Sequence, residues 1–229
     1  MAHSAAFRWD APLSPVVRLT ERCAREPQFP WRGSGCNRYS NPRRSLIVPS
    51  IFTHAVVPLI LGAAAGRRCI SGRLLFVGAV AAMLPDLDVA ALKLGIRYQD
   101  AFGHRGATHS IAFALVLAML AALAHPLLKS TAWRSAVFVG LAALSHPLLD
   151  MCTNGGMGVA LLWPFSEHRW FSPFRPIAVS PLGVTRFVGS RGVAVMASEL
   201  YWVWLPTALL SLALVVGRWI EKSNPPDQA

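Results

Sequence analysis

The sequence predicts an all-α fold: a polytopic membrane bundle of about five apolar helices with one long polar and aromatic loop. Three observations predict it. Of the 229 residues, 54% are hydrophobic and only 14% are charged, whereas soluble domains carry about a quarter charged residues. Five apolar stretches approach the ~20 residues that cross a hydrocarbon core. The connections between these stretches are short and basic, apart from one long segment before the last stretch.

In chain order, the first segment differs from the rest. Residues 1–47 contain eight arginines against three acidic residues and show no helical or strand periodicity, which predicts a disordered basic leader. An alternative is that translation begins at Val48. Residues 48–220 then form the membrane domain, and residues 221–229 form a polar tail. The expected spans are 47–66, 74–94, 108–128, 136–152 and 194–217.

The long loop covers residues 153–193 and is rich in Trp, Pro, Phe and Arg. This composition is typical of the membrane interface, and its length favours a lid or binding loop over a simple connector. The formal net charge of +11 does not indicate nucleic-acid binding, because no basic stripe alternates with exposed aromatics. We expect these cations to contact anionic lipid headgroups. The four cysteines have no paired spacing, which argues against a disulfide framework or a zinc knuckle.

Histidines and aspartates gather at the ends of four spans. They lie at the start of the first, in the second half of the second, around the start of the third and at the end of the fourth. Antiparallel helices with short connections bring those four ends to one membrane face. The candidates for metal ligands are His54, Asp86, Asp88, His109, His146 and Asp150. Ionisable groups in membrane segments are costly, and they are functional candidates by default.

The spacing within these motifs leaves alternatives open. His146 and Asp150, at i and i+4, share a helix face, although Pro147 loosens the preceding turn. Asp86 and Asp88 point to opposite sides of a regular helix, so either one is a ligand and the other supports it, or Pro85 breaks the helix and turns both inward.

His104 and His109 need a loop to bring them together. We expect Gly106 to let that loop turn and Thr108 to cap the following helix. His3 and His125 lie away from the cluster and are interpreted as non-functional, whereas His168, in the polar loop, is interpreted as a solvated or interfacial residue, with assistance to the substrate as the alternative.

Imidazole and carboxylate in this ratio suit zinc, manganese or iron(II) better than calcium or magnesium. With up to seven donors, a two-metal site is also conceivable. Three arginines, Arg105, Arg169 and Arg175, lie on the same face. Each is a candidate for binding a phosphate or carboxylate, or for extending to lipid headgroups.

Several motifs together resemble a known family, the LexA-regulated, inner-membrane-associated, metal-dependent hydrolases (YdjM-like). They are "PSIFTHAVVPL", "LPDLD", "HRGATHS", "SHPLLDMCTNGG" and "LLWPFS", in the family's order from about residue 48 to 183. A more distant likeness is to the helical zinc phospholipase C and nuclease superfamily, whose HxxxD pattern fits His146 and Asp150. The leader lies outside the family pattern, and the distant likeness does not fix the number of metals.

The resemblance implies a multi-pass protein of the bacterial inner membrane that hydrolyses an ester. The most plausible substrate is a phosphoester of a lipid or envelope metabolite, and membrane lipids are the expected partners. His104 is then a candidate catalytic proton carrier or extra ligand, and Arg105 a candidate catalytic anion binder. Two alternatives remain: a transporter or ion-conducting protein with a His/Asp relay, and a non-catalytic stress-response protein with a structural metal site.

Overall fold

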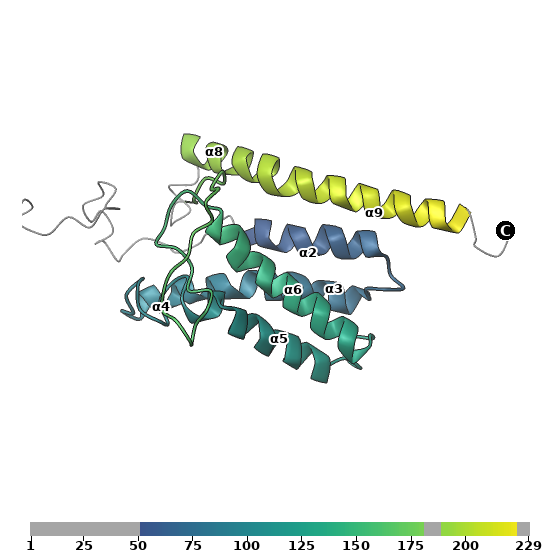
Figure 1. Cartoon of the computed structure of the whole chain (residues 1–229), viewed down its shortest axis with the longest axis horizontal. Helices are drawn as coiled ribbons and strands as arrows, with labels where there is room; N and C mark the ends of the chain where they lie inside the picture. Colours follow the sequence, from purple (N-terminus) through teal and green to yellow (C-terminus); the bar gives the residue numbers. More distant parts are fainter. Residues whose placement is uncertain (1–50, 181–188, 224–229) are drawn as a thin grey trace, which may run out of the picture. The chain divides into compact units, whose positions relative to one another are not determined.

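The structure, a computed structural model, describes residues 51–180 and 189–223 (Figure 1). All of the described residues belong to one compact unit. The expected leader, Val48, residues 181–188 of the aromatic loop and residues 224–229 of the tail lie outside the described residues.

The regular elements of the described residues are all helical. Two isolated bridges, Thr153 with Ile177 and Val159 with Trp170, are the only β-type pairings there. The helices are α2 (Ile51–Ala65), α3 (Gly72–Met83), η1 (Leu84–Asp88), α4 (Val89–Lys93), η2 (Ala107–His109), α5 (Ile111–Leu123), α6 (Ala132–Met151), α8 (Ser190–Glu199), η3 (Leu200–Trp204) and α9 (Leu205–Ser223). The all-α prediction is therefore confirmed.

Each expected span corresponds to one helix or one run of helices. Two runs, Gly72–Lys93 and Ser190–Ser223, are long and apolar enough to cross a membrane. Helices α2 and α5 have 15 and 13 residues, which at 1.5 Å per residue gives about 22 and 20 Å. The hydrocarbon core is about 30 Å thick. The structure thus gives two candidate membrane spans, beside shorter apolar helices.

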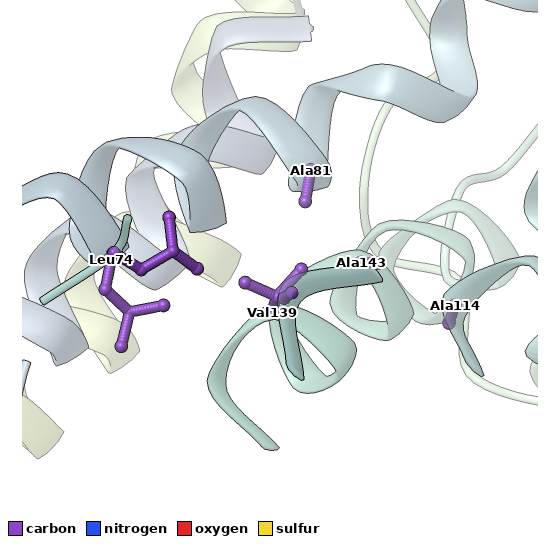
Figure 2. Packing of buried hydrophobic residues seen from close by; sticks show 7 residues of the cluster. Leu74, Ala81, Ala114, Val139 and Ala143 are labelled. Atoms are coloured by element: carbon purple, nitrogen blue, oxygen red, sulfur yellow. The ribbon is translucent and has the colours of Figure 1, made fainter. Parts of the chain in front are cut away.

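Small side chains let three helices pack closely. Helix α6 packs against both α3 and α5. Figure 2 shows the contact layer, in which Leu74 and Ala81 of α3, Val139 and Ala143 of α6 and Ala114 of α5 lie together. Small residues at helix interfaces are typical of membrane bundles, where close van der Waals packing holds helices together.

One aromatic side chain of α6 lies against two glycines. A Cβ atom on Gly78 of α3 would lie 2.3 Å from Phe138, and one on Gly62 of α2 would lie 2.8 Å from it. Glycine is therefore required at both positions for the Phe138 ring to pack between α2 and α3. This contact fixes α6 relative to α2, which carries His54, and to α3, which leads directly into the η1 turn that carries Asp86.

Large apolar side chains are exposed along α5 and α9. On α5 they include Leu115 and Leu123, which are 64% and 74% exposed, and on α9 they include Leu209 and Leu212. Soluble monomers rarely expose apolar patches of this extent. These faces are suited to contact with lipid chains.

Candidate metal centre

The structure brings together every candidate ligand that the sequence indicated. They come from helix ends: His54 from α2, Asp86 and Asp88 from η1, His109 from η2, and His146 and Asp150 from α6. His104 and Arg105 lie in the loop just before η2. Apart from the partly buried Asp88, these residues are each no more than 8% exposed. The predicted convergence of four chain segments is confirmed.

Four of these residues form a compact group of donors, Asp86, His109, His146 and Asp150, each of which offers one atom within 4.8 Å of the others. The distances are 3.0 Å from His109 Nε2 to His146 Nε2, 3.2 Å from His109 Nε2 to Asp150 Oδ2, 3.4 Å from His146 Nε2 to Asp86 Oδ1, 3.7 Å from His146 Nε2 to Asp150 Oδ2, and 3.9 Å from His109 Nε2 to Asp86 Oδ1. We call this set the four-donor group.

Hydrogen bonds behind the two histidines orient their rings. His146 Nδ1 lies 2.7 Å from the carbonyl oxygen of Ala82, which is one of the last four carbonyls of α3 and therefore lacks a partner within that helix. His109 Nδ1 lies 3.1 Å from Asp88 Oδ2. Both partners are acceptors, so each Nδ1 donates a proton, and a ring that carries no second proton directs its Nε2 lone pair into the four-donor group. Metal-ligating histidines are usually held by such an outer hydrogen bond.

The sequence left two arrangements open for "LPDLD". The structure shows the one in which the helix is interrupted at Pro85 and both Asp86 and Asp88 turn inward. Pro85 lies in η1, a 3₁₀ turn between α3 and α4. In an α-helix, residues two apart point about 160° away from each other, but in a 3₁₀ turn this angle is about 120°. Asp86 thereby reaches His146, while Asp88 reaches His104 and His109.

Asp88 accepts hydrogen bonds on both oxygens. Oδ1 lies 2.6 Å from His104 Nδ1, and Oδ2 accepts from Thr108 Oγ1 at 2.7 Å and from the backbone N–H of Arg105 at 3.1 Å. Asp88, His104 and His109 form a second set with metal-type spacing. Because the lone pairs of Asp88 are already used, this geometry favours a supporting role in orienting His109.

Asp150 has a different partner on each oxygen. Arg105 Nη2 donates to Oδ1 at 3.0 Å, whereas Oδ2 is buried and accepts no hydrogen bond from the described residues. Arg105 Nη1 donates to Thr153 Oγ1 and to the carbonyl of Gly155, both at 3.1 Å. The guanidinium that we expected to bind an anion is therefore engaged within the protein, and only its Nε lacks a partner there.

Arg105 is a buried cation, and its backbone has a left-handed conformation. Burial alone would lower the pKa of Arg105, but the facing carboxylate of Asp150 outweighs burial and helps to raise that pKa above its usual value, so Arg105 remains a cation. Its φ of 63° lies in the left-handed region, which costs a non-glycine residue about 1–2 kcal/mol. Gly156, at φ 86°, lies so close that a Cβ would be 2.7 Å from Arg105 Nη1. The second glycine of "TNGG" thus makes room for the guanidinium.

His54 lies beside the four-donor group. Its ring stacks on that of His146, with centroids 3.7 Å apart. Its Nε2 is 3.9 Å from Asp150 Oδ1, which is too long for a hydrogen bond, and its Nδ1 is buried without a partner among the described residues. His54 therefore has unused donor and acceptor capacity at the centre.

The loop before α5 differs in detail from our expectation. Ser110, not Thr108, caps α5 by accepting from the backbone N–H of Phe113. Thr108 lies in η2 and donates to Asp88 instead. The left-handed turn is at Arg105, and Gly106 is needed because a Cβ there would lie 2.2 Å from the carbonyl of Ala101.

Sequence reasoning missed some supporting residues and placed others correctly. It gave Thr108 only a helix-capping role and gave Thr153 no role, because their partners at the centre come from distant parts of the chain. His125 bonds to Ser130 at the far end of α5, and His168 is exposed against Trp170. Neither belongs to the four-donor group, as expected.

The residues present fit a divalent metal ion. Two imidazole lone pairs and two carboxylate oxygens face one another, and Asp150 Oδ2 is buried without a donor. A cation satisfies all four donors at once, and buried charges are otherwise costly. The group can therefore hold a metal ion, and nitrogen and oxygen donors of this kind accept several transition metals.

The fold and the centre define a helical membrane protein with a buried His/Asp site where its helices end. The chain belongs to the YdjM inner membrane protein family, whose model matches residues 50–224. It is 44% identical to the inner membrane protein YbcI of Escherichia coli (strain K12) over 164 residues, which are 71% of this chain and 95% of that protein. The predicted inner-membrane location is confirmed. No solved structure matches the chain significantly, so the likeness to the zinc phospholipase C and nuclease superfamily stays a prediction.

Proposed function

We propose that this protein is a metal-dependent hydrolase of the inner membrane. The observation that carries the proposal is the four-donor group with His54 beside it. A site that only stabilises the fold needs the four donors. It does not need a further buried histidine whose Nδ1 has no partner. The motif resemblance supports the same reaction class.

Zinc is the metal that we propose, with manganese or iron(II) as alternatives. Four ligands about 2.0–2.1 Å from a tetrahedral ion are about 3.3–3.4 Å apart. The five donor distances given above, from 3.0 to 3.9 Å, scatter around this value. A bound metal ion of this type would lower the pKa of its bound water to about 7, which would supply hydroxide at neutral pH.

Some of the surrounding residues hold the metal ligands in place, and one carries a proton. Arg105 holds Asp150 by one oxygen and leaves Oδ2 for the centre. Asp88 holds His109, and the 2.6 Å contact between Asp88 and His104 lets this pair hold a proton close to the site. We propose His104 as the proton carrier, and we propose that Arg105 acts through Asp150 rather than on the substrate.

The substrate that we propose is an ester, namely a phosphoester of a lipid or envelope metabolite. The centre is built where α2, η1, η2 and α6 begin or end, so in a bundle of antiparallel spans it lies near one membrane face. That position suits a headgroup ester at the membrane surface. It argues against a transporter, because secondary transporters bind their substrates near the bilayer midplane.

A structural metal site is the second candidate, and one observation favours it. His109 and His146 are completely buried, and structural zinc sites are closed by four protein ligands, whereas catalytic sites keep a position open. The absence of cysteine from the four-donor group argues the other way, because many structural zinc sites contain cysteine.

A substrate screen separates the two candidates. Purified zinc-loaded protein in detergent is assayed against phosphodiester, phosphomonoester and carboxylic ester substrates. We expect hydrolysis that is lost in His146→Ala and Asp150→Ala and kept in His125→Ala and His168→Ala. A protein that binds zinc but hydrolyses none of these substrates would favour the structural site.

A further inference from the structure

Arg169, from the aromatic loop, binds the backbone of the loop that carries His104 and Arg105. Its Nη1 donates to the carbonyls of His104 and Arg105 at 3.1 and 3.3 Å. Its Nη2 donates to the carbonyls of Tyr98 and Asp100, both at 3.2 Å. One half-buried guanidinium therefore joins both ends of residues 98–105.

No carboxylate within salt-bridge distance pairs with Arg169 in the part of the chain that the structure describes. Its guanidinium lies 5.9 Å from the centre of the Tyr98 ring. Burial raises the pKa of Tyr98 to about 12, so this ring is a neutral phenol and the contact is cation–π. The carboxylate of Asp100 instead pairs with Arg97. The carbonyl oxygens are thus the main polar partners of Arg169.

This arrangement requires the shape of an arginine. A guanidinium is planar and presents donors in fixed directions, so its two nitrogens can each serve a pair of carbonyls. An ammonium group has three donors around a single point and cannot reach both pairs. A lysine at position 169 would keep the charge but would leave some of these carbonyls unpaired.

The loop that Arg169 holds is conformationally demanding. Arg105 has a left-handed backbone, and Gly103 and Gly106 lie so close to neighbouring carbonyls that a Cβ would be 2.1 and 2.2 Å from them. Strained backbone persists only where its surroundings enforce it. The carbonyl of Arg105 is also held by the N–H of Ala160 at 3.0 Å, so the aromatic loop supports this turn twice.

We propose that Arg169 is a positioning residue for the metal centre. Arg169 fixes the loop at residues 98–105. This loop places two groups against Asp88, the backbone N–H of Arg105 and the ring of His104. It also places the guanidinium of Arg105 against Asp150. Through Arg169, the aromatic loop thereby controls the geometry of the Asp88 and Asp150 carboxylates. Arg169 itself does not contact the four-donor group. This inference rests on the proposed metal site but not on hydrolysis.

Cobalt(II) binding tests the proposal, because its visible absorption reports coordination geometry. The full chain in detergent is titrated with Co²⁺ as wild type, Arg169→Lys and Arg169→Gln. Arg175→Lys and Arg175→Gln are matched controls, since Arg175 is an exposed arginine of the same loop that stacks 4.8 Å over Phe171. Hydrogen–deuterium exchange of the peptide covering residues 97–107 in metal-free protein is the second readout.

We expect both Arg169 variants to bind Co²⁺ about 10–100-fold more weakly, as is usual when outer partners of metal ligands are lost. Their absorption spectra should change, and residues 97–107 should exchange faster, while the Arg175 variants match wild type. If Arg169→Gln does not fold, Arg169→Lys decides the question. Wild-type affinity and spectrum in Arg169→Lys would overturn the inference. A wild-type protein that binds neither Co²⁺ nor Zn²⁺ would instead refute the proposed function.

Discussion

The two oxygens of Asp150 show how single residues prepare the centre. Oδ1 is held by Arg105, and Oδ2 is left buried without a donor. A carboxylate that is free to rotate would present either oxygen. One that is fixed by a guanidinium presents only one. Arg105 also supplies a positive charge that offsets part of the negative charge that the buried aspartates bring to this site.

At the residue scale, we predict that breaking two different arginine–aspartate pairs will lower the free energy of unfolding by very different amounts. In metal-stripped protein, Arg105→Gln should lower the free energy of unfolding by about 3–5 kcal/mol, because it leaves Asp150 buried and unpaired. Arg97→Gln breaks the exposed pair with Asp100 and should cost no more than about 1 kcal/mol. Thermal unfolding in one detergent compares them. Equal shifts for the two variants would contradict the role of Arg105.

At the scale of elements, close helix packing and one short 3₁₀ turn set the positions of the donors. Phe138 of α6 lies against Gly62 and Gly78, which holds α6 on α2 and α3. The 3₁₀ turn η1 follows at the end of α3 and directs Asp86 and Asp88 to different histidines. A change in helix packing should therefore reach the centre even without a polar substitution.

Gly78→Ala tests this dependence. The new Cβ would lie 2.3 Å from Phe138, and overpacking of this kind costs about 1–3 kcal/mol. Gly217→Ala on α9 is the control, because nothing lies within 4 Å of its Cβ, and it should be neutral or slightly stabilising. Thermal unfolding measures both variants, and Phe138→Leu should restore part of the loss in Gly78→Ala. An unchanged melting temperature in Gly78→Ala would show that the contact is not tight.

At the scale of the whole molecule, much of the centre follows from topology. The alternation of helix direction was enough to predict that His54, Asp86, His109 and His146 meet, because each lies at a predictable end of its helix. The helical fold class followed from the apolar stretches. Helix lengths were less predictable, since polar motifs such as "LPDLD" and "HRGATHS" shorten the regular segments.

Contacts that depend on the exact path of the loops were not predictable. Nothing in the sequence marks Arg105 as the residue with a left-handed backbone. The neighbouring glycine, Gly106, predicted the turn one residue later. For Arg169 the sequence left open binding to a phosphate or carboxylate and extension to lipid headgroups, because nothing in it reveals that four carbonyls of a loop some 65 residues earlier surround this side chain. Thr108 was predicted to be a helix cap, because its contact with Asp88, 20 residues earlier, cannot be read from the sequence.

The most direct test of the account is the metal content of the purified full-length protein, measured by mass spectrometry of the elements after exchange into metal-free buffer. We predict about one equivalent of a divalent transition metal per chain. His146→Ala and Asp86→Asn should lose it, Asp88→Asn should bind about 10–100-fold more weakly, and His125→Ala should match wild type. A wild-type protein with no more metal than His146→Ala, even after incubation with zinc, manganese or iron(II), would contradict a metal centre at these residues.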